Sequence, residues 1–300
     1  MNRHIIYDSI TASVGALISG KKKFFANSLE SQCYEEHIES IKLDCPPINS
    51  VGTYEIKAKT LAGELDCAFR VAQWLGIDYP TIIYHHGNNE RPFDFKRFAK
   101  NTFYNIFFNK SDTIEANLIV VRAPFHDCKL SYYQEKMTEL NNFMAMISTS
   151  VKLNEVLIQQ LRGLSKESVI TVGISLGGWV TNLHRGLYNS STVYVPLLAG
   201  TLLGELFLRS KYKKMTSSLA FENPEIIRTL LNFDKLFKRH YTQNVFPLLS
   251  KFDQFIEYDV QKETYDGYPL KTIDCGHVSG ALSTDELRDH LLWVFKLTEK

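Results

Sequence analysis

Residues 169–178 read Val-Ile-Thr-Val-Gly-Ile-Ser-Leu-Gly-Gly. The β-branched run at 169–172 predicts a strand, and helical character follows the motif to about Leu187. Between the two elements stands G-x-S-x-G, and this order of strand, motif and helix is typical of a nucleophile elbow. Such a turn holds its serine at a positive φ, and the glycines remove side chains that would collide. The pattern therefore predicts the Ser175 hydroxyl at the tip of a strained turn. The alternative is a buried serine in a glycine-rich strand–helix turn.

A histidine and an acidic residue follow Ser175 along the chain. His277 stands on a loop that we expect after a short strand at 268–275. Asp253 lies a few residues past a predicted buried strand at 245–249. In a catalytic triad the imidazole takes the proton of the serine and the carboxylate orients the imidazole, so these three residues are the candidate catalytic set. Other candidates for the acid are Glu257, Asp259 and Glu205, and the non-catalytic alternatives are a surface loop histidine and an N-cap aspartate.

An upstream segment, Thr81-Ile-Ile-Tyr-His-His-Gly-Asn-Asn89, predicts a buried strand that ends in His-Gly. Acyl transfer builds negative charge on a carbonyl oxygen, which two backbone N–H groups can stabilise. We expect one N–H from Leu176 and the other from Asn88. A metal-binding pair made of His85 and His86 is disfavoured, because adjacent strand residues point to opposite faces.

With these pieces the chain resembles the α/β-hydrolase superfamily over about residues 52–298. The resemblance implies an α/β-hydrolase fold, with a mostly parallel central sheet, helices on both faces and a helical cap insertion. It implies that Ser175 is the nucleophile, His277 the general base and Asp253 the acid, and that the two backbone N–H groups form the oxyanion hole. The chain lacks the H-G-G-G loop of some lipases and the D-x-R-G-x-G-x-S turn of many members. It is therefore not assigned to a characterised branch.

Three further residues are candidate substrate-binding residues: His86 at the end of the upstream strand, His126 at the expected rim of the crevice, and Trp179 after the elbow, for which packing is the alternative. The expected reaction is hydrolysis of a carboxylic ester through an acyl-enzyme, with a small-molecule ester or acyl substrate and without a cofactor or metal. The same triad also suits a thioesterase, a peptidase or an acyltransferase. A non-catalytic scaffold that binds a small ligand is the alternative from another class.

The alternation of strands and helices predicts a mostly parallel sheet with its ligand crevice at the carboxyl ends of the strands. Residues 1–50 are expected to form an N-terminal helical extension, with helix over 1–45 ending before Pro46-Pro47. Residues 51–300 are expected to form the α/β-hydrolase domain, with a cap insertion at about 201–244. This insertion has more basic than acidic residues, which fits an anionic substrate or a solvated helix surface.

Composition limits the partners. A net charge of +1 gives no general attraction to nucleic acid. Five cysteines, without a C-x-x-C pair, favour a reducing compartment. No uncharged apolar stretch reaches the roughly 20 residues that a membrane-spanning helix needs. We therefore expect a cytoplasmic protein without an integral membrane segment, of unknown oligomeric state.

Overall fold

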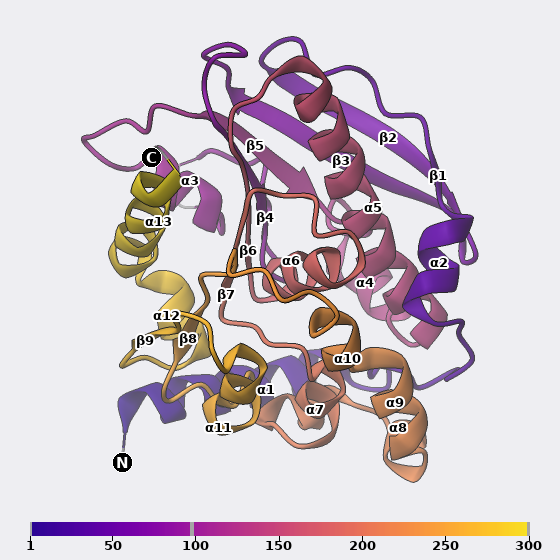
Figure 1. Cartoon of the computed structure of the whole chain (residues 1–300). Helices are drawn as coiled ribbons and strands as arrows, with labels where there is room; N and C mark the ends of the chain where they lie inside the picture. The colour runs from indigo at the N-terminus through magenta and orange to yellow at the C-terminus, as the bar shows by residue number, and fades with distance from the viewer. Residues whose placement is uncertain (1, 97–98, 299–300) are drawn as a thin grey trace.

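The computed structural model describes residues 2–96 and 99–298. Positions 1, 97–98 and 299–300 belong to the predicted N-terminal extension and hydrolase domain, and they lie outside the described residues. The centre of the structure is a nine-stranded sheet in the order β1-β2-β3-β5-β4-β6-β7-β8-β9 (Figure 1). Its strands are β1 (Lys42–Leu43), β2 (Gly52–Thr60), β3 (Gly63–Gln73), β4 (Thr81–His85), β5 (Asn117–Arg122), β6 (Val169–Ile174), β7 (Val193–Leu197), β8 (Leu248–Ser250) and β9 (Lys271–Ile273). The β1–β2, β2–β3 and β3–β5 pairs are antiparallel and the others parallel, so the mostly parallel sheet is confirmed.

Helices cover both faces of the sheet, as predicted (Figure 1). Alternate residues of β4 point to opposite sides: Ile83 belongs to the core beneath α5 and α6, and Ile82 to the core beneath α3 and α13. The helices are α1 (Arg3–Ser19), α2 (Tyr34–Ser40), α3 (Thr102–Phe107), α4 (Leu130–Lys136), α5 (Leu140–Leu164), α6 (Leu176–Leu187), α7 (Leu203–Leu208), α8 (Ser218–Glu222), α9 (Pro224–Leu231), α10 (Asp234–Phe237), α11 (Tyr258–Gln261), α12 (His277–Leu282) and α13 (Thr284–Thr298), with 3₁₀ turns η1 (Lys211–Met215) and η2 (Lys262–Tyr265).

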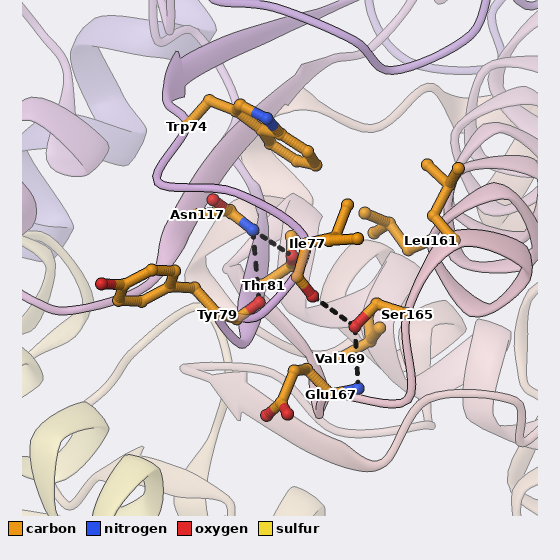
Figure 2. A pocket seen from close by; sticks show the side chains of 10 residues that line it. Trp74, Ile77, Tyr79, Thr81, Asn117, Leu161, Ser165, Glu167 and Val169 are labelled. Carbon is orange, nitrogen blue, oxygen red and sulfur yellow. Dashed lines mark hydrogen bonds between the residues drawn. The ribbon is translucent and has the colours of Figure 1, made fainter.

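The amino ends of β4, β5 and β6 are closed by hydrogen bonds (Figure 2). The side-chain amide of Asn117 donates to the carbonyl of Tyr79 and to the hydroxyl of Thr81, at 3.3 and 3.2 Å. The Ser165 hydroxyl donates to the carbonyl of Ile77. The cavity beside these residues holds only about 10 Å³, so this end of the sheet offers little room for a ligand.

The predicted helix over residues 1–45 is wrong for the segment 20–33, which joins α1 to α2 without helix, and for residues 41–45, which contain the strand β1. Phe24 and Phe25 are buried there and pack on the ring of Phe207. Their backbone N–H groups donate to carbonyls of distant segments, that of Phe25 to Met137 at 3.0 Å. Burial of the two aromatic rings therefore stabilises a non-helical segment. The hydrogen bonds to distant carbonyls take the place of those that a continuous helix would make. The first helix, α1, packs against α12 and η1 (Figure 1).

Residues 201–244, the predicted cap insertion, fold as α7, η1, α8, α9 and α10. Glu205, one of the alternative acids, lies here and accepts a hydrogen bond from Arg228 at 2.8 Å. The division of the chain near residue 50 and the role of the insertion as a cap stay predictions. In the described ranges, no helix combines the length and apolar character needed to cross a bilayer.

The turn between β6 and α6 has the strained geometry that the motif predicts. Ser175 has a φ of 53°. A Cβ atom on Gly173 would stand 2.0 Å from the carbonyl oxygen of Gly177, and one on Gly177 would stand 2.1 Å from that of His85. Neither distance is sterically possible, so α6 rests directly on the carboxyl ends of β6 and β4 because both positions are glycine.

We expect Gly177→Ala to lower the free energy of unfolding by about 3 kcal/mol or more, because backbone must move to make room for the methyl group. Gly163→Ala is the matched control. It lies in the last turn of α5, where a Cβ meets nothing within 4 Å, and should raise stability by about 0.5–1 kcal/mol. Denaturant titration of both variants measures the difference. Equal stabilities would contradict the tight turn.

Candidate active site

Ser175 lies between the end of β6 and the first turn of α6. Its backbone N–H donates to the carbonyl of Leu197 at 2.9 Å, and its carbonyl accepts from the N–H of Trp179 at 3.0 Å. The side-chain oxygen lies 2.9 Å from Nε2 of His277. The turn is therefore fixed on both sides, and the hydroxyl points at an imidazole that can take its proton.

Asp253 orients the imidazole of His277. Its Oδ2 lies 2.7 Å from Nδ1 of His277, and its Oδ1 accepts the N–H groups of Phe255 and Ile256 at 2.8 and 2.7 Å. A carboxylate at Nδ1 places the ring proton there and leaves Nε2 free to accept the proton of Ser175. The structure thus brings the three predicted triad residues into one hydrogen-bonded chain.

The predicted loop position of His277 is wrong, because this residue begins α12. The preceding residue, Gly276, donates its N–H to the Ser279 hydroxyl at 3.0 Å. This contact caps the helix, so the chain becomes helical after the three residues, 274–276, that follow β9. The imidazole of His277 is consequently carried by the first residue of α12.

Burial and charge act in opposite directions on His277. Burial lowers its pKa, but the charge and hydrogen bond of Asp253, with a further contribution from Asp8, raise the pKa above its usual value. For Asp253, burial raises the pKa, and the interaction with His277 opposes that shift. The carboxyl group of Asp253 therefore favours the imidazolium form of His277.

Leu176 and Asn88 both line the cavity in front of Ser175. Among the described residues, no protein acceptor takes the backbone N–H of either one. The side-chain amide of Asn88 donates to the Tyr212 hydroxyl at 3.3 Å, and its oxygen lies 3.1 Å from Nε2 of His126. Both residues therefore line the cavity at Ser175, and side-chain contacts hold the Asn88 loop in place. Their role as oxyanion donors stays a prediction.

The cavity at Ser175 is small, about 40 Å³. Trp179 lines it while packing edge-on against Phe233, so its packing is observed and its role in substrate binding stays a prediction. His126 lies instead on an adjoining groove of about 740 Å³. Four residues line both spaces: Phe24, Asn88, Tyr133 and Tyr212.

The expectation that His85 and His86 point to opposite faces is wrong. Their rings stack with centroids 5.0 Å apart, because β4 ends at His85 and strand alternation no longer applies to the next residue. The Nε2 atom of His86 accepts the N–H of Ala123 at 3.1 Å, and its Nδ1 donates to the carbonyl of Gly87. Burial lowers the pKa of His86 well below its usual value. This predicted substrate residue thus ties the Asn88 loop to the end of β5.

Comparison with protein-family models finds no match, and no curated protein is similar in sequence. Solved structures are similar. Acetyl xylan esterase 1 from Thermoanaerobacterium sp. JW/SL YS485 has a TM-score of 0.53 and 13% identity over 86% of this chain and 90% of its own. An esterase from Pyrococcus furiosus has a TM-score of 0.52 and 12% identity over 86% and 98%. The acylaminoacyl peptidase of Pyrococcus horikoshii has a TM-score of 0.51 and 13% identity over 80% of this chain and 40% of its own.

The chain has the α/β-hydrolase fold. Within this fold, Ser175 follows the central strand β6, and Asp253 and His277 follow β8 and β9 at one edge of the sheet. At identities of 12–13%, the similarity to these structures supports a shared fold and does not assign their activities to this chain.

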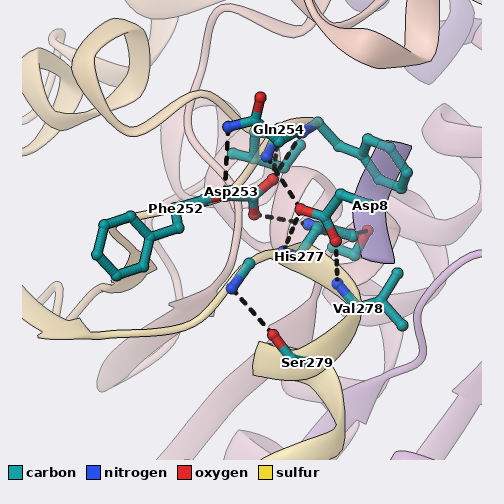
Figure 3. Close-up of polar contacts among 11 residues, drawn as sticks. Asp8, Phe252, Asp253, Gln254, His277, Val278 and Ser279 are labelled. Atoms are coloured by element: carbon teal, nitrogen blue, oxygen red, sulfur yellow. Dashed lines mark hydrogen bonds and ion pairs between the residues drawn. The ribbon is translucent and has the colours of Figure 1, made fainter. Parts of the chain in front are cut away.

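Two acidic residues near the Ser175–His277–Asp253 chain are missing from the sequence-based candidates. Asp8 accepts the backbone N–H of His277 (Figure 3). Glu90 accepts the N–H groups of Gly87 and Thr102 at 3.3 and 3.0 Å, next to the Asn88 loop. Burial raises the pKa of Glu90 to about 7, although these N–H groups oppose the shift. The sequence offers little signal for either residue, since an isolated acid in a helix or loop is usually solvated.

The raised pKa of Glu90 predicts a pH-dependent stability. In the unfolded chain the group titrates near 4.5 and in the folded chain near 7. Between these values the folded state binds more protons, so this contribution to stability falls as pH rises through the window. We expect Glu90→Gln, which cannot ionise, to gain stability relative to the wild type between pH 5 and pH 8.

Denaturant unfolding of both proteins at pH 5 and pH 8 measures this effect. Glu115→Gln, at an exposed position before β5, is the matched control. If the difference between wild type and Glu90→Gln is the same at both pH values, the carboxyl group of Glu90 does not titrate in this window.

Proposed function

We propose that the protein is a serine hydrolase that cleaves carboxylic esters through an acyl-enzyme intermediate. The observation that carries the proposal is the continuous chain from the Ser175 hydroxyl through His277 to the Asp253 carboxyl group, with distances of 2.9 and 2.7 Å. At the same cavity, two backbone N–H groups that have no acceptor among the described residues add the means to stabilise an oxyanion. The similar structures, two esterases and a peptidase, support hydrolase chemistry on this fold.

The geometry supports a two-step reaction. Nε2 of His277 removes the hydroxyl proton of Ser175 as Oγ attacks the ester carbonyl, and the N–H groups of Leu176 and Asn88 receive the negative charge. The imidazolium, stabilised by Asp253, then gives its proton to the departing alcohol. Water attacks the acyl-enzyme with His277 as base, which releases the acid and restores the serine.

The size of the cavity supports a short acyl group. The space in front of Ser175 is about 40 Å³ and is bordered by apolar side chains, among them Leu203, Leu206 and Phe207. The larger groove begins beyond Asn88. We infer that the acyl chain occupies the small cavity and that the alcohol part extends to the groove.

A cytoplasmic location and the absence of a nucleic-acid partner stay predictions.

The first test is labelling of the purified protein with a fluorophosphonate, which reacts rapidly only with an activated serine. We expect fast labelling of the wild type that is lost in Ser175→Ala and His277→Ala. Ser50→Ala, at an exposed position, is the matched control and should label like the wild type. A folded wild-type protein that is not labelled would refute the proposal and favour a scaffold that only binds a ligand.

The second test concerns acyl length. We expect kcat/KM for p-nitrophenyl acetate to exceed that for p-nitrophenyl decanoate by about tenfold or more, because a long chain would have to displace packed side chains. Leu206→Ala enlarges the cavity and should reduce this ratio. Leu230→Ala, a partly buried leucine of α9, should leave the ratio unchanged. A wild-type preference for the decanoate would contradict the assignment of the small cavity to the acyl group.

A further inference from the structure

The N-terminal helix α1 carries a fully buried carboxyl group. Asp8 has an exposed fraction of 0%, and only Asp8 and Ala12 are buried in this helix. Large apolar residues of α1 face solvent instead, such as Ile10 at 55% and Leu17 at 82% exposure. A buried carboxyl group is costly unless its oxygens accept hydrogen bonds. The partners of Asp8 therefore explain its position.

These partners are three backbone N–H groups at the triad (Figure 3). Oδ2 of Asp8 accepts from His277 at 2.8 Å and from Gln254 at 3.1 Å, and Oδ1 accepts from Val278 at 3.0 Å. Gln254 directly follows Asp253. One carboxyl group thus joins the loop that carries the acid to the helix start that carries the histidine.

Gly276, the residue before His277, leaves room for the contact with Asp8 because it has no side chain. A Cβ atom on Gly276 would stand 2.8 Å from Oδ2 of Asp8 and 3.0 Å from the carbonyl oxygen of His4. Any side chain there would push α1 away from the triad. The same helix makes a further contact, because Nδ1 of His4 lies 2.8 Å from the hydroxyl of Ser279.

We propose that Asp8 is a positioning residue of the Ser175–His277–Asp253 site, so that the docked helix α1 sets the placement of the acid and the histidine relative to each other. Asp8 acts through the backbone of the Asp253 loop and of the first turn of α12, and takes no part in proton transfer. The kinetic consequence rests on the proposed hydrolase function, whereas the structural consequence at His277 does not.

Charge provides a second effect that can be separated from positioning. Burial lowers the pKa of His277, and the charges of Asp253 and Asp8 raise it. Tyr133 and Tyr212 are titratable groups that line the same cavity as His277, and His4 on α1 contacts Ser279 in the first turn of α12. Removal of the Asp8 charge should therefore lower the pKa of His277. Loss of positioning should instead lower the rate at pH values where the imidazole is fully neutral.

The experiment compares Asp8→Asn and Gly276→Ala with the wild type. Asp78→Asn, an exposed charge at the amino end of β4, is the matched control. The rate of fluorophosphonate labelling is measured against pH, and the His277 imidazole is titrated by NMR. We expect the high-pH plateau of the rate to fall by about 10- to 100-fold in both site variants. The pKa of His277 should fall in Asp8→Asn and not in Asp78→Asn.

Gly276→Ala retains the Asp8 charge and so reports on positioning alone. If a folded Asp8→Asn protein keeps the wild-type plateau and the wild-type pKa of His277, the proposal is overturned. If Asp8→Asn does not fold, a wild-type plateau in Gly276→Ala overturns it equally. If the wild type is not labelled, the proposed function fails. The Asp8 proposal is then decided by the NMR titration and by faster amide exchange at His277 and Val278 in Asp8→Asn.

Discussion

The site depends first on the close contact between α6 and the end of β4. The chain reverses at Ser175 with a φ of 53°, and Gly177 lies where any Cβ would stand 2.1 Å from the carbonyl oxygen of His85. This contact sets the first turn of α6 against the strand that leads into the Asn88 loop. One steric requirement therefore brings Ser175 and the residues of both candidate oxyanion donors to the same cavity, before the side chains around it are considered.

The acid and the histidine are held by a different kind of constraint. β8 and β9 have three residues each and end the sheet at one edge, so strand pairing alone places these two groups weakly. Hydrogen bonds supply the rest: Asp253 is fixed by the N–H groups that follow it, and Asp8 fixes the loop and the helix start together. Steric packing therefore places Ser175 and the start of α6, whereas hydrogen bonds place Asp253 and His277.

This division explains what could be predicted from the sequence. The elbow is a local signal, so the strand, the turn, Ser175 and α6 follow from ten consecutive residues, and His277 and Asp253 follow from chain order. The contact of Asp8 with His277 spans 269 residues, and no local pattern distinguishes a buried aspartate in α1 from a solvated one. The same limit applies to residues 20–33, where burial of Phe24 and Phe25 between distant segments overrides helix formation.

The two parts of the site should also differ in stability within the folded protein. The elbow lies among fully buried parallel strands, and its opening would expose much of the core. The helix α1 buries only Asp8 and Ala12, so its release would expose little apolar surface and cost correspondingly little hydrophobic free energy. Release of α1 removes the shared acceptor of three backbone N–H groups at the acid and the histidine. The arrangement of Asp253 and His277 is therefore the part of the site that a local opening disturbs first, while Ser175 keeps its place on the sheet.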